Sequence, residues 1–385
     1  MSWKVSLSDI DFGPEEEEAV RQVIHGRWLS MGEQTQQFEA EFARFIGCKH
    51  AIAVTNATAA LHLACVAAGL KRGDEVIVPS LTFVATANAV RYTGAKPVFA
   101  DIEGPNWLTI APKSIEAALT DRTRAILVMH YGGYACDMPA IMRIARRRRL
   151  VVLEDSAHAI GSELEGRKLG AWGLVGCYSF FSNKNMTTGE GGMLCTDDDA
   201  VAERLRLLRS HGMTSLSWDR HKGHAWSYDV VDLGYNYRID EMRSALGRVQ
   251  LKKLPGNNAH RAALTGLYRD LLAECAPSVQ MPFEGTRGTS CHHILPILLP
   301  AGMDRTQFME GMKARGIQTS IHYPPVHGFQ AYRMAARRAK ERLPHTVDVA
   351  AREVTLPLYP TMSEAEVELA ATAVGGVVRS AEGRS

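Results

Sequence analysis

The chain has 385 residues, a length that predicts one large core with a smaller appended domain. Apolar residues make up 46% of it, enough for a packed interior, and its formal charge of +2 gives no reason to expect a nucleic acid or a membrane as partner. The seven cysteines are scattered without a C-x-x-C pair, which predicts free thiols and neither disulfides nor a metal site. Because no signal peptide or membrane span is visible, we expect a cytoplasmic protein.

Short apolar runs alternate with helical patterns from about residue 35 to residue 200. After the predicted strand His50–Val54, the predicted helix Thr58–Gly69 carries apolar residues at i, i+3, i+4 and i+7, and its last residue is a glycine. The other strands predicted here are Glu75–Pro79, Lys96–Ala100, Arg124–His130, Leu150–Glu154, Cys177–Phe181 and Gly192–Thr196. The other helices predicted here are Thr82–Tyr92, Ser114–Leu119 and Met138–Arg148, and the basic run Arg146–Arg149 is expected to be a solvated helix end.

This alternation is typical of crossover units that build a mainly parallel sheet with helices on both faces. The strands are continuous apolar runs, as expected when both faces of a sheet are buried. A helix is predicted for Glu241–Leu251, and the pattern changes after Leu254. Beyond that point a strand is predicted for His293–Leu298 and a helix for Arg305–Arg315. We therefore expect an α/β protein with a large domain, residues 1–255 (including an N-terminal segment 1–34), and a smaller α+β domain, residues 256–385.

Three polar features lie where predicted strands end, which is where ligands gather in an open parallel sheet. The turn Thr55–Thr58 opens the first sheet helix, so its backbone N–H groups suit a phosphate, although Thr58 could serve only as the helix N-cap. Asp155 ends a second strand, and Ser179 and Lys184 lie at the end of a third. Pyridoxal phosphate (PLP) needs an amine for its Schiff base, a carboxylate for its ring nitrogen and phosphate donors. The three features together meet these needs.

Several motifs of the chain match those of a known family and occur in the same order. The chain resembles the DegT/DnrJ/EryC1/StrS family of PLP-dependent sugar aminotransferases, which have the aspartate-aminotransferase fold, fold type I. The resemblance runs nearly end to end through the segments Arg27–Gly32, Gly73–Phe83, Glu154–Gly161, Tyr178–Gly192, Gly234–Glu241, His322–Pro325 and Leu356–Pro360.

The resemblance implies a role for each matching residue. Lys184 would form the Schiff base and move the proton, and Asp155 would pair with the ring nitrogen. The other cofactor-binding residues would be Ala57, Thr58 and Ser179 at the phosphate, Phe83 stacked on the ring, His158 near the ring hydroxyl and Asn236 from the partner subunit. The substrate candidates are Arg238, His322 and Tyr323. The active protein would then be a homodimer with shared sites, using a keto sugar and an amino donor, glutamate or glutamine.

The chain departs from the family pattern at two positions. Ala57 stands where glycine is commoner, and its backbone N–H still serves a phosphate. His158 stands where glutamine is also frequent, and a histidine there is expected to titrate near neutrality. A dehydratase, deoxygenating or aromatising relative is an alternative, with Lys184 arguing against the dehydratase branch, and a non-catalytic regulator is another. The His- and Trp-rich stretch 210–226 fits a substrate pocket and a subunit contact equally well.

Overall fold

The computed structural model describes residues 3–214, 227–285, 287–332 and 343–382 of the chain. Its centre is a seven-stranded sheet with the order β1-β11-β10-β7-β6-β2-β3. Neighbouring strands run parallel except at β11, which is antiparallel to both β1 and β10. These strands are β1 (His50–Val54), β2 (Glu75–Pro79), β3 (Lys96–Ala100), β6 (Thr123–Met129), β7 (Val151–Asp155), β10 (Val175–Ser179) and β11 (Gly192–Thr196). The predicted mainly parallel sheet is therefore confirmed.

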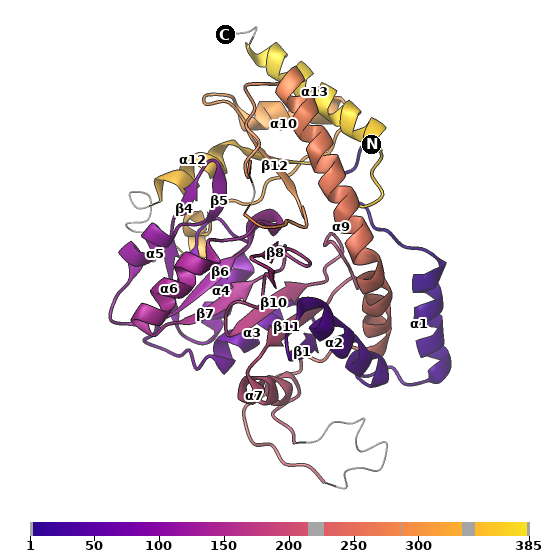
Figure 1. The fold of residues 1–385 in the computed structure, drawn as a ribbon, viewed down its shortest axis with the longest axis vertical. Helices are drawn as coiled ribbons and strands as arrows, with labels where there is room; N and C mark the ends of the chain where they lie inside the picture. Colours follow the sequence, from indigo (N-terminus) through magenta and orange to yellow (C-terminus); the bar gives the residue numbers. More distant parts are fainter. Residues whose placement is uncertain (1–2, 215–226, 286, 333–342, 383–385) are drawn as a thin grey trace.

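Helices cover both faces of this sheet (Figure 1). One face packs against α3 (Ala57–Ala67), α4 (Val84–Tyr92) and α7 (Asp199–Arg209). The other packs against α2 (Glu33–Ile46), α5 (Pro112–Ala118), α6 (Met138–Arg148) and the first half of α9 (Glu241–Cys275). The run Arg146–Arg149 is exposed at the end of α6, as expected of a solvated helix end.

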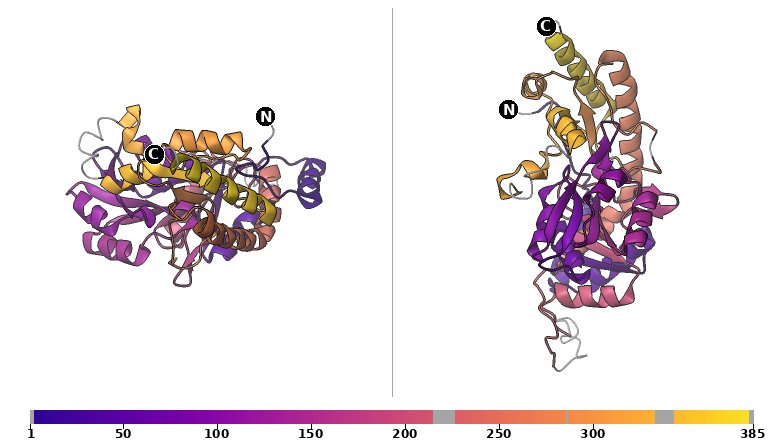
Figure 2. Two further views of the ribbon diagram at one scale, coloured as in Figure 1. Left: turned by 90° about the horizontal axis from the view of Figure 1, so that it is seen from above. Right: turned by 90° about the vertical axis from the view of Figure 1, so that its left-hand side faces the viewer.

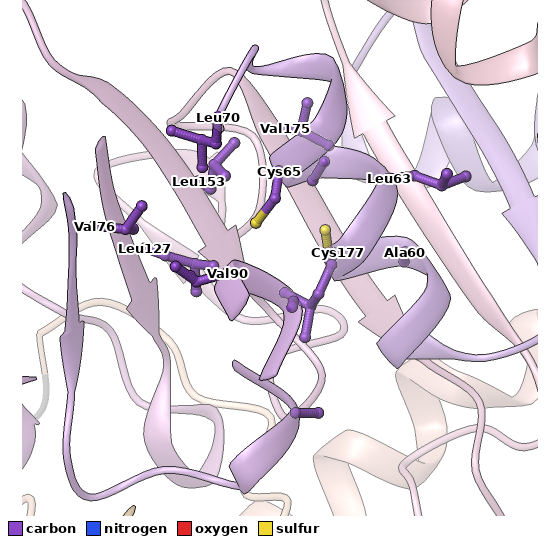
Figure 3. Close-up of a cluster of buried hydrophobic side chains, with 14 of the residues drawn as sticks. Ala60, Leu63, Cys65, Leu70, Val76, Val90, Leu127, Leu153, Val175 and Cys177 are labelled. Carbon is purple, nitrogen blue, oxygen red and sulfur yellow. The ribbon is translucent and has the colours of Figure 1, made fainter. Parts of the chain in front are cut away.

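The cluster between the sheet and α3 is apolar throughout (Figure 3). Cys65 of α3 lies among Leu153 of β7, Val175 and Cys177 of β10, and all four are buried. Every residue of β10 is buried, which explains why the strand has no polar alternation.

Helix α9 runs unbroken from the sheet to the C-terminal elements, so the predicted helix end at Leu251 is wrong. Pro255 lies inside it, where a proline costs about 3 kcal/mol because it removes a backbone hydrogen bond. Leu254 packs into the cluster beneath the sheet, whereas Leu264 and Tyr268 pack into a second cluster beyond the proline. Burial on both sides of Pro255 favours a continuous helix over a break.

The second cluster joins the far half of α9 to the C-terminal elements, which gather at one end of the molecule (Figures 1 and 2). The elements of this cluster are β12 (Leu295–Leu298), α10 (Arg305–Ala314), β13 (Glu353–Leu356) and α13 (Glu364–Glu382). Helix α12 (Pro344–Arg352) packs instead near Ile102, in a separate cluster that includes Val349 and Ala350. Val5 also packs into the second cluster and bridges to Ile317. Because α9 spans residues 255 and 256, the division into domains 1–255 and 256–385 stays a proposal.

The remaining elements are short or peripheral. Helix α1 (Pro14–Gly26) packs along α9. The short strands are β4 (Ile102–Gly104), β5 (Trp107–Ile110), β8 (Glu163–Leu164) and β9 (Arg167–Lys168), and the 3-10 turns are Tyr131–Gly133, Val326–Gly328 and Gln330–Tyr332. All seven cysteines are free thiols. No helix in the described part of the chain combines the length and the apolar composition that crossing a bilayer requires.

Candidate active site

The carboxyl ends of β1, β7 and β10 lie at one edge of the sheet, together with the start of β11. Val54 and Ser179 both pair with Gly192, one on each side of it, and Cys177 pairs with Asp155. Because neighbouring strands lie about 4.8 Å apart, the turn after β1 and Ser179 are separated by roughly 10 Å. Asp155 lies one strand further along the same edge.

The turn after β1 has the form of an anion-binding helix start. Asn56 caps α3, and its Oδ1 accepts a hydrogen bond from the N–H of Ala59 at 2.9 Å. The alternative in which Thr58 is the N-cap is therefore wrong, and Ala57 and Thr58 form the first turn of the helix. The first N–H groups of a helix have no partner within it and form the positive end of its dipole. A Cβ on Gly192 would lie 2.6 Å from the carbonyl carbon of Asn56, so glycine allows β11 to approach this turn.

Asp155 is a buried carboxylate with two hydrogen-bond donors. Thr86 of α4 donates to Oδ2 at 2.7 Å, and the N–H of Ala157 donates to Oδ1 at 3.2 Å. Burial raises the pKa of Asp155 in spite of these donors, because the charged form loses its hydration. A cation beside this carboxylate would restore the charge balance.

Lys184 follows β10 and is half-buried. Its Nζ lies 3.2 Å from Nε2 of His293. Burial lowers the pKa of Lys184 to about 8, although the charge of Asp155 opposes the shift. At pH 7 about one molecule in ten then carries a neutral, nucleophilic amine, whereas an ordinary lysine is neutral in roughly one of 3000. The arrangement makes Lys184 a reactive amine.

His158 is held in one tautomer by its partners. The N–H of Gly132 donates to Nδ1 at 3.3 Å, so Nε2 carries the hydrogen and faces the Tyr323 hydroxyl at 2.9 Å. Burial lowers the pKa of His158 well below its ordinary value of 6.5. The expectation that it titrates near neutrality is therefore wrong: in the described part of the chain its ring bonds a backbone N–H and a hydroxyl, and no carboxylate favours the charged form.

Two aromatic residues and His322 complete the wall of the site. Phe83 precedes α4 with 52% of its surface exposed, and its ring centroid lies 5.7 Å from that of Tyr323. His322 Nδ1 lies 2.8 Å from the hydroxyl of Thr355, which in turn donates to the buried Glu353. Burial raises the pKa of Glu353 to about 8, so this hydrogen-bonded chain begins at a buried carboxyl group. Burial lowers the pKa of His322 to about 4.

The structure thus gathers most of the predicted residues at one edge and adds several that the sequence reading missed. Lys184, Asp155, His158 and Tyr323 are brought together, since the charges of Lys184 and Asp155 act on one another and His158 contacts Tyr323. The missed residues are Thr86, Asn185 and His293. A polar pair directly before the apolar run of β12 was a usable signal for His293, but nothing local marks Thr86.

Asn236 and Arg238 lie beside the turn after β1 of their own chain. Arg238 bridges to Val54, and its guanidinium donates to the hydroxyl of Ser210 at 3.0 Å. Asn236 bridges to Ser210 through the backbone, and its side chain is exposed. Of the stretch 210–226, residues 215–226 lie outside the described part of the chain.

Solved structures of other proteins share this fold over nearly the whole chain. The solved aminotransferase TlmJ from Streptoalloteichus hindustanus matches with a TM-score of 0.90 at 32% identity, covering 98% of this chain and 99% of its own. DesI, solved in the presence of its TDP-sugar product, matches with a TM-score of 0.88 at 30% identity, covering 100% and 95%. The fold is therefore that of the type I PLP-dependent transferases, as predicted.

Sequence comparison identifies the family. The model of the DegT/DnrJ/EryC1/StrS aminotransferase family matches residues 11–375. The spore coat polysaccharide biosynthesis protein SpsC of Bacillus subtilis (strain 168) is 40% identical over 375 residues, which is 96% of each chain. The chain belongs to the DegT/DnrJ/EryC1/StrS aminotransferase family, and the predicted enzyme class, an aminotransferase, is confirmed.

Proposed function

We propose that this enzyme uses PLP to move an amino group from glutamate, or glutamine, to a keto sugar that is linked to a nucleotide. The observation that carries the proposal is the buried pair at the sheet edge, with the reactive amine of Lys184 near the carboxylate of Asp155. PLP supplies an aldehyde that captures amines covalently and a protonated ring that accepts electrons from the bond being broken. Both buried groups suit it, because one is nucleophilic and the other needs a cationic partner.

Each residue of the edge has a task in this proposal. Asp155 keeps the ring nitrogen protonated, and the free amine of Lys184 moves the proton at the substrate carbon. The phosphate is bound by the backbone N–H of Ala57, by Thr58 and by Ser179. Phe83 stacks on the ring through its exposed face.

Four further residues complete the proposed site. His158 lies near the ring hydroxyl, although both its ring nitrogens already contact other groups of the protein. Arg238, His322 and Tyr323 face the substrate. His322 supports this placement, because its Nδ1 bonds Thr355 and its Nε2 can form a hydrogen bond with a sugar hydroxyl in either tautomer.

The names of the relatives support a sugar substrate. SpsC is named for polysaccharide biosynthesis, and DesI was solved with a TDP-sugar. The product would then serve amino-sugar, cell-surface polysaccharide or secondary-metabolite synthesis, and the enzyme would act in the cytoplasm. A coupled assay with glutamate and a panel of nucleotide keto sugars and keto-inositols tests the substrate. Dehydration or aromatisation without transfer of nitrogen would favour the alternative branch, and a protein without a visible cofactor band would favour a regulator.

The proposed enzyme is a homodimer in which Asn236 completes the phosphate site of the partner subunit. Exposed apolar side chains next to Asn236 support such a contact, since Val230, Val231 and Leu233 are between 55% and 81% exposed in the single chain. A shared site needs an isologous dimer, so the monomer is expected to be inactive.

Mixing two inactive variants tests the shared site. Lys184→Ala removes the amine, and Asn236→Asp places a carboxylate where it repels the cofactor phosphate. In a mixed dimer with shared sites, one site has both lesions and the other has neither, so part of the activity returns. Subunit exchange is first verified by mass spectrometry. If exchange occurs and no activity returns, Asn236 serves its own chain.

A further inference from the structure

Buried amide side chains form a hydrogen-bonded chain that leads to Lys184. Asn258 of α9 donates from Nδ2 to the carbonyl of Ile160 at 3.0 Å, and its Oδ1 accepts from Nδ2 of Asn185 at 2.8 Å. Nδ2 of Asn185 also donates to the carbonyl of Cys291 at 2.7 Å. Both amide hydrogens of Asn185 are thereby donated, so the atom that it turns toward His293 is its acceptor oxygen Oδ1.

The oxygen of Asn185 determines the tautomer of His293. Nδ1 of His293 lies 2.9 Å from this oxygen and must carry the hydrogen that is donated to it. Nε2 then has a lone pair, and it lies 3.2 Å from Nζ of Lys184. Turning the Asn185 amide over would place its oxygen against the oxygens of Cys291 and Asn258, which are both acceptors, so the other tautomer is disfavoured.

We propose that His293 is a positioning residue that holds the amine of Lys184 through Nε2, and that Asn185 and Asn258 keep His293 in the tautomer that does so. This inference rests on the proposed function, because it concerns the task of Lys184 there. An amine that donates one hydrogen to a fixed acceptor has its lone pair directed away from that acceptor. When the amine gains a proton from the substrate, the same acceptor receives a stronger, charge-assisted hydrogen bond.

The groups around Lys184 are compatible with this role. Burial lowers the pKa of His293 well below 6.5, so the ring stays neutral and keeps its lone pair. His158 and His322 are held neutral by burial as well. The acidic groups whose charges act on Lys184 are Asp155 of β7 and the thiol of Cys291, and burial raises the pKa of that thiol to about 11. Among the side chains that the structure describes, His293 is the one with a hydrogen-bond contact to Nζ.

A matched pair of substitutions separates the lysine contact from general damage. In His293→Asn the amide can replace Nδ1 toward Asn185, but no atom reaches the position of Nε2. In His293→Gln the longer side chain can place its oxygen there. His292→Asn is the control, because His292 contacts Tyr134 and has no contact with Lys184. Asparagine also tolerates the left-handed backbone at position 292, where φ is 48°.

The decisive readout is the pH dependence of Lys184 acetylation by acetic anhydride in the cofactor-free full chain, followed by peptide mass spectrometry. The wild-type midpoint is expected near pH 8. His293→Asn should move it down by about one pH unit, because the ammonium form loses the more strongly bonded acceptor. His293→Gln should restore part of the shift, and His292→Asn should show none. In the holoenzyme, kcat should fall roughly tenfold to a hundredfold in His293→Asn with KM nearly unchanged.

The amide chain has its own test. Nitrogen NMR of the histidines should find the hydrogen of His293 on Nδ1, a mixture of tautomers in Asn185→Ala, and a smaller change in Asn258→Ala, where Asn185 keeps its bond to Cys291. An unchanged acetylation midpoint in folded His293→Asn, or a hydrogen on Nε2 in the wild type, overturns the inference. If borohydride fails to fix the cofactor to Lys184 in the wild type, the proposed function itself is wrong, and the two failures are thereby distinguished.

Discussion

On each of the strands β7 and β10, an apolar core residue and a polar residue of the candidate site lie two positions apart. In β7, Leu153 lies in the apolar cluster and Asp155 lies at the site, two residues further on and on the same face. In β10, Cys177 and Ser179 repeat the pattern. The core residues need no polar partners, whereas Asp155 depends on Thr86 of α4 and on the N–H of Ala157.

The comparison also shows that burial alone does not decide reactivity. Burial raises the pKa of Cys177 well above its ordinary value, and it lowers the pKa of Lys184 to about 8. In both cases the charged form is disfavoured. A thiol reacts as the anion and an amine as the neutral base, so the same physical effect makes the cysteine inert and the lysine reactive.

The largest expected effect comes from removing the reactive amine. Lys184→Ala should abolish amino transfer and the absorbance band of the Schiff base, because no other described residue of the loop can both form that bond and move the proton. The matched core change, Cys177→Ala, should keep the band and an activity within about threefold of wild type. An absorbance scan and the coupled assay measure both. Amino transfer by Lys184→Ala would show that Lys184 is no more important for the reaction than the core residue Cys177.

Asp155→Asn preserves shape and removes the charge that holds the cofactor ring protonated. The rate should fall on the order of a thousandfold, equivalent to about 4 kcal/mol in the transition state. The unfolding free energy of the cofactor-free variant should be equal or higher, because burial already disfavours the charged form. A rate within tenfold of wild type would mean that Asp155 does not contact the ring.

Leu153→Ala, on the same strand as Asp155, should lower stability and leave the reaction rate nearly unchanged. Its side chain is fully buried, so truncation should lower the unfolding free energy by about 2–5 kcal/mol, as measured by urea unfolding. Activity per folded, cofactor-loaded molecule should stay within a few fold. A large loss of kcat without a loss of stability would contradict the separation of core and site.

The pKa of Lys184 also predicts a pH dependence of stability in the cofactor-free protein. With a folded pKa of about 8 and an ordinary value of 10.5, the unfolded chain binds the extra proton between these values, so this group makes the protein more stable as pH rises through that window. Lys184→Met has no such charge, so its free energy of unfolding should exceed that of wild type by the largest amount below pH 8. The difference should shrink by up to about 3 kcal/mol toward pH 10.5. Urea unfolding of both proteins at several pH values measures it, and a constant difference would refute the low pKa.

Much of the fold could be predicted because the strands are continuous apolar runs between turn residues. The bounds of β1, β2, β3 and β11 match the prediction residue for residue. The antiparallel direction of β11 was not predicted, since local periodicity carries no information on strand direction. The continuation of α9 through Pro255 was missed because packing on both sides outweighs the intrinsic cost of the proline.

For the site, the position at the edge of the sheet could be predicted, but the side chains that contact Lys184 and Asp155 there could not. The rule for parallel sheets places Asp155 and Lys184 together, which the charge interaction between them supports. His293 lies 109 residues after Lys184, and only the tertiary fold brings it to Nζ. The neutral state of His158 depends on the depth of its burial, which the sequence does not record. The cofactor roles assigned to individual residues stay predictions.

Borohydride reduction of the purified, cofactor-loaded enzyme, followed by peptide mapping, tests the central claim most directly. The claim is that the buried polar edge of the sheet is the cofactor site and that Lys184 is its reactive amine. Reduction should fix one cofactor per chain to Lys184 and to no other lysine. A label on any other lysine, or yellow protein in which reduction leaves Lys184 unmodified, would contradict the account.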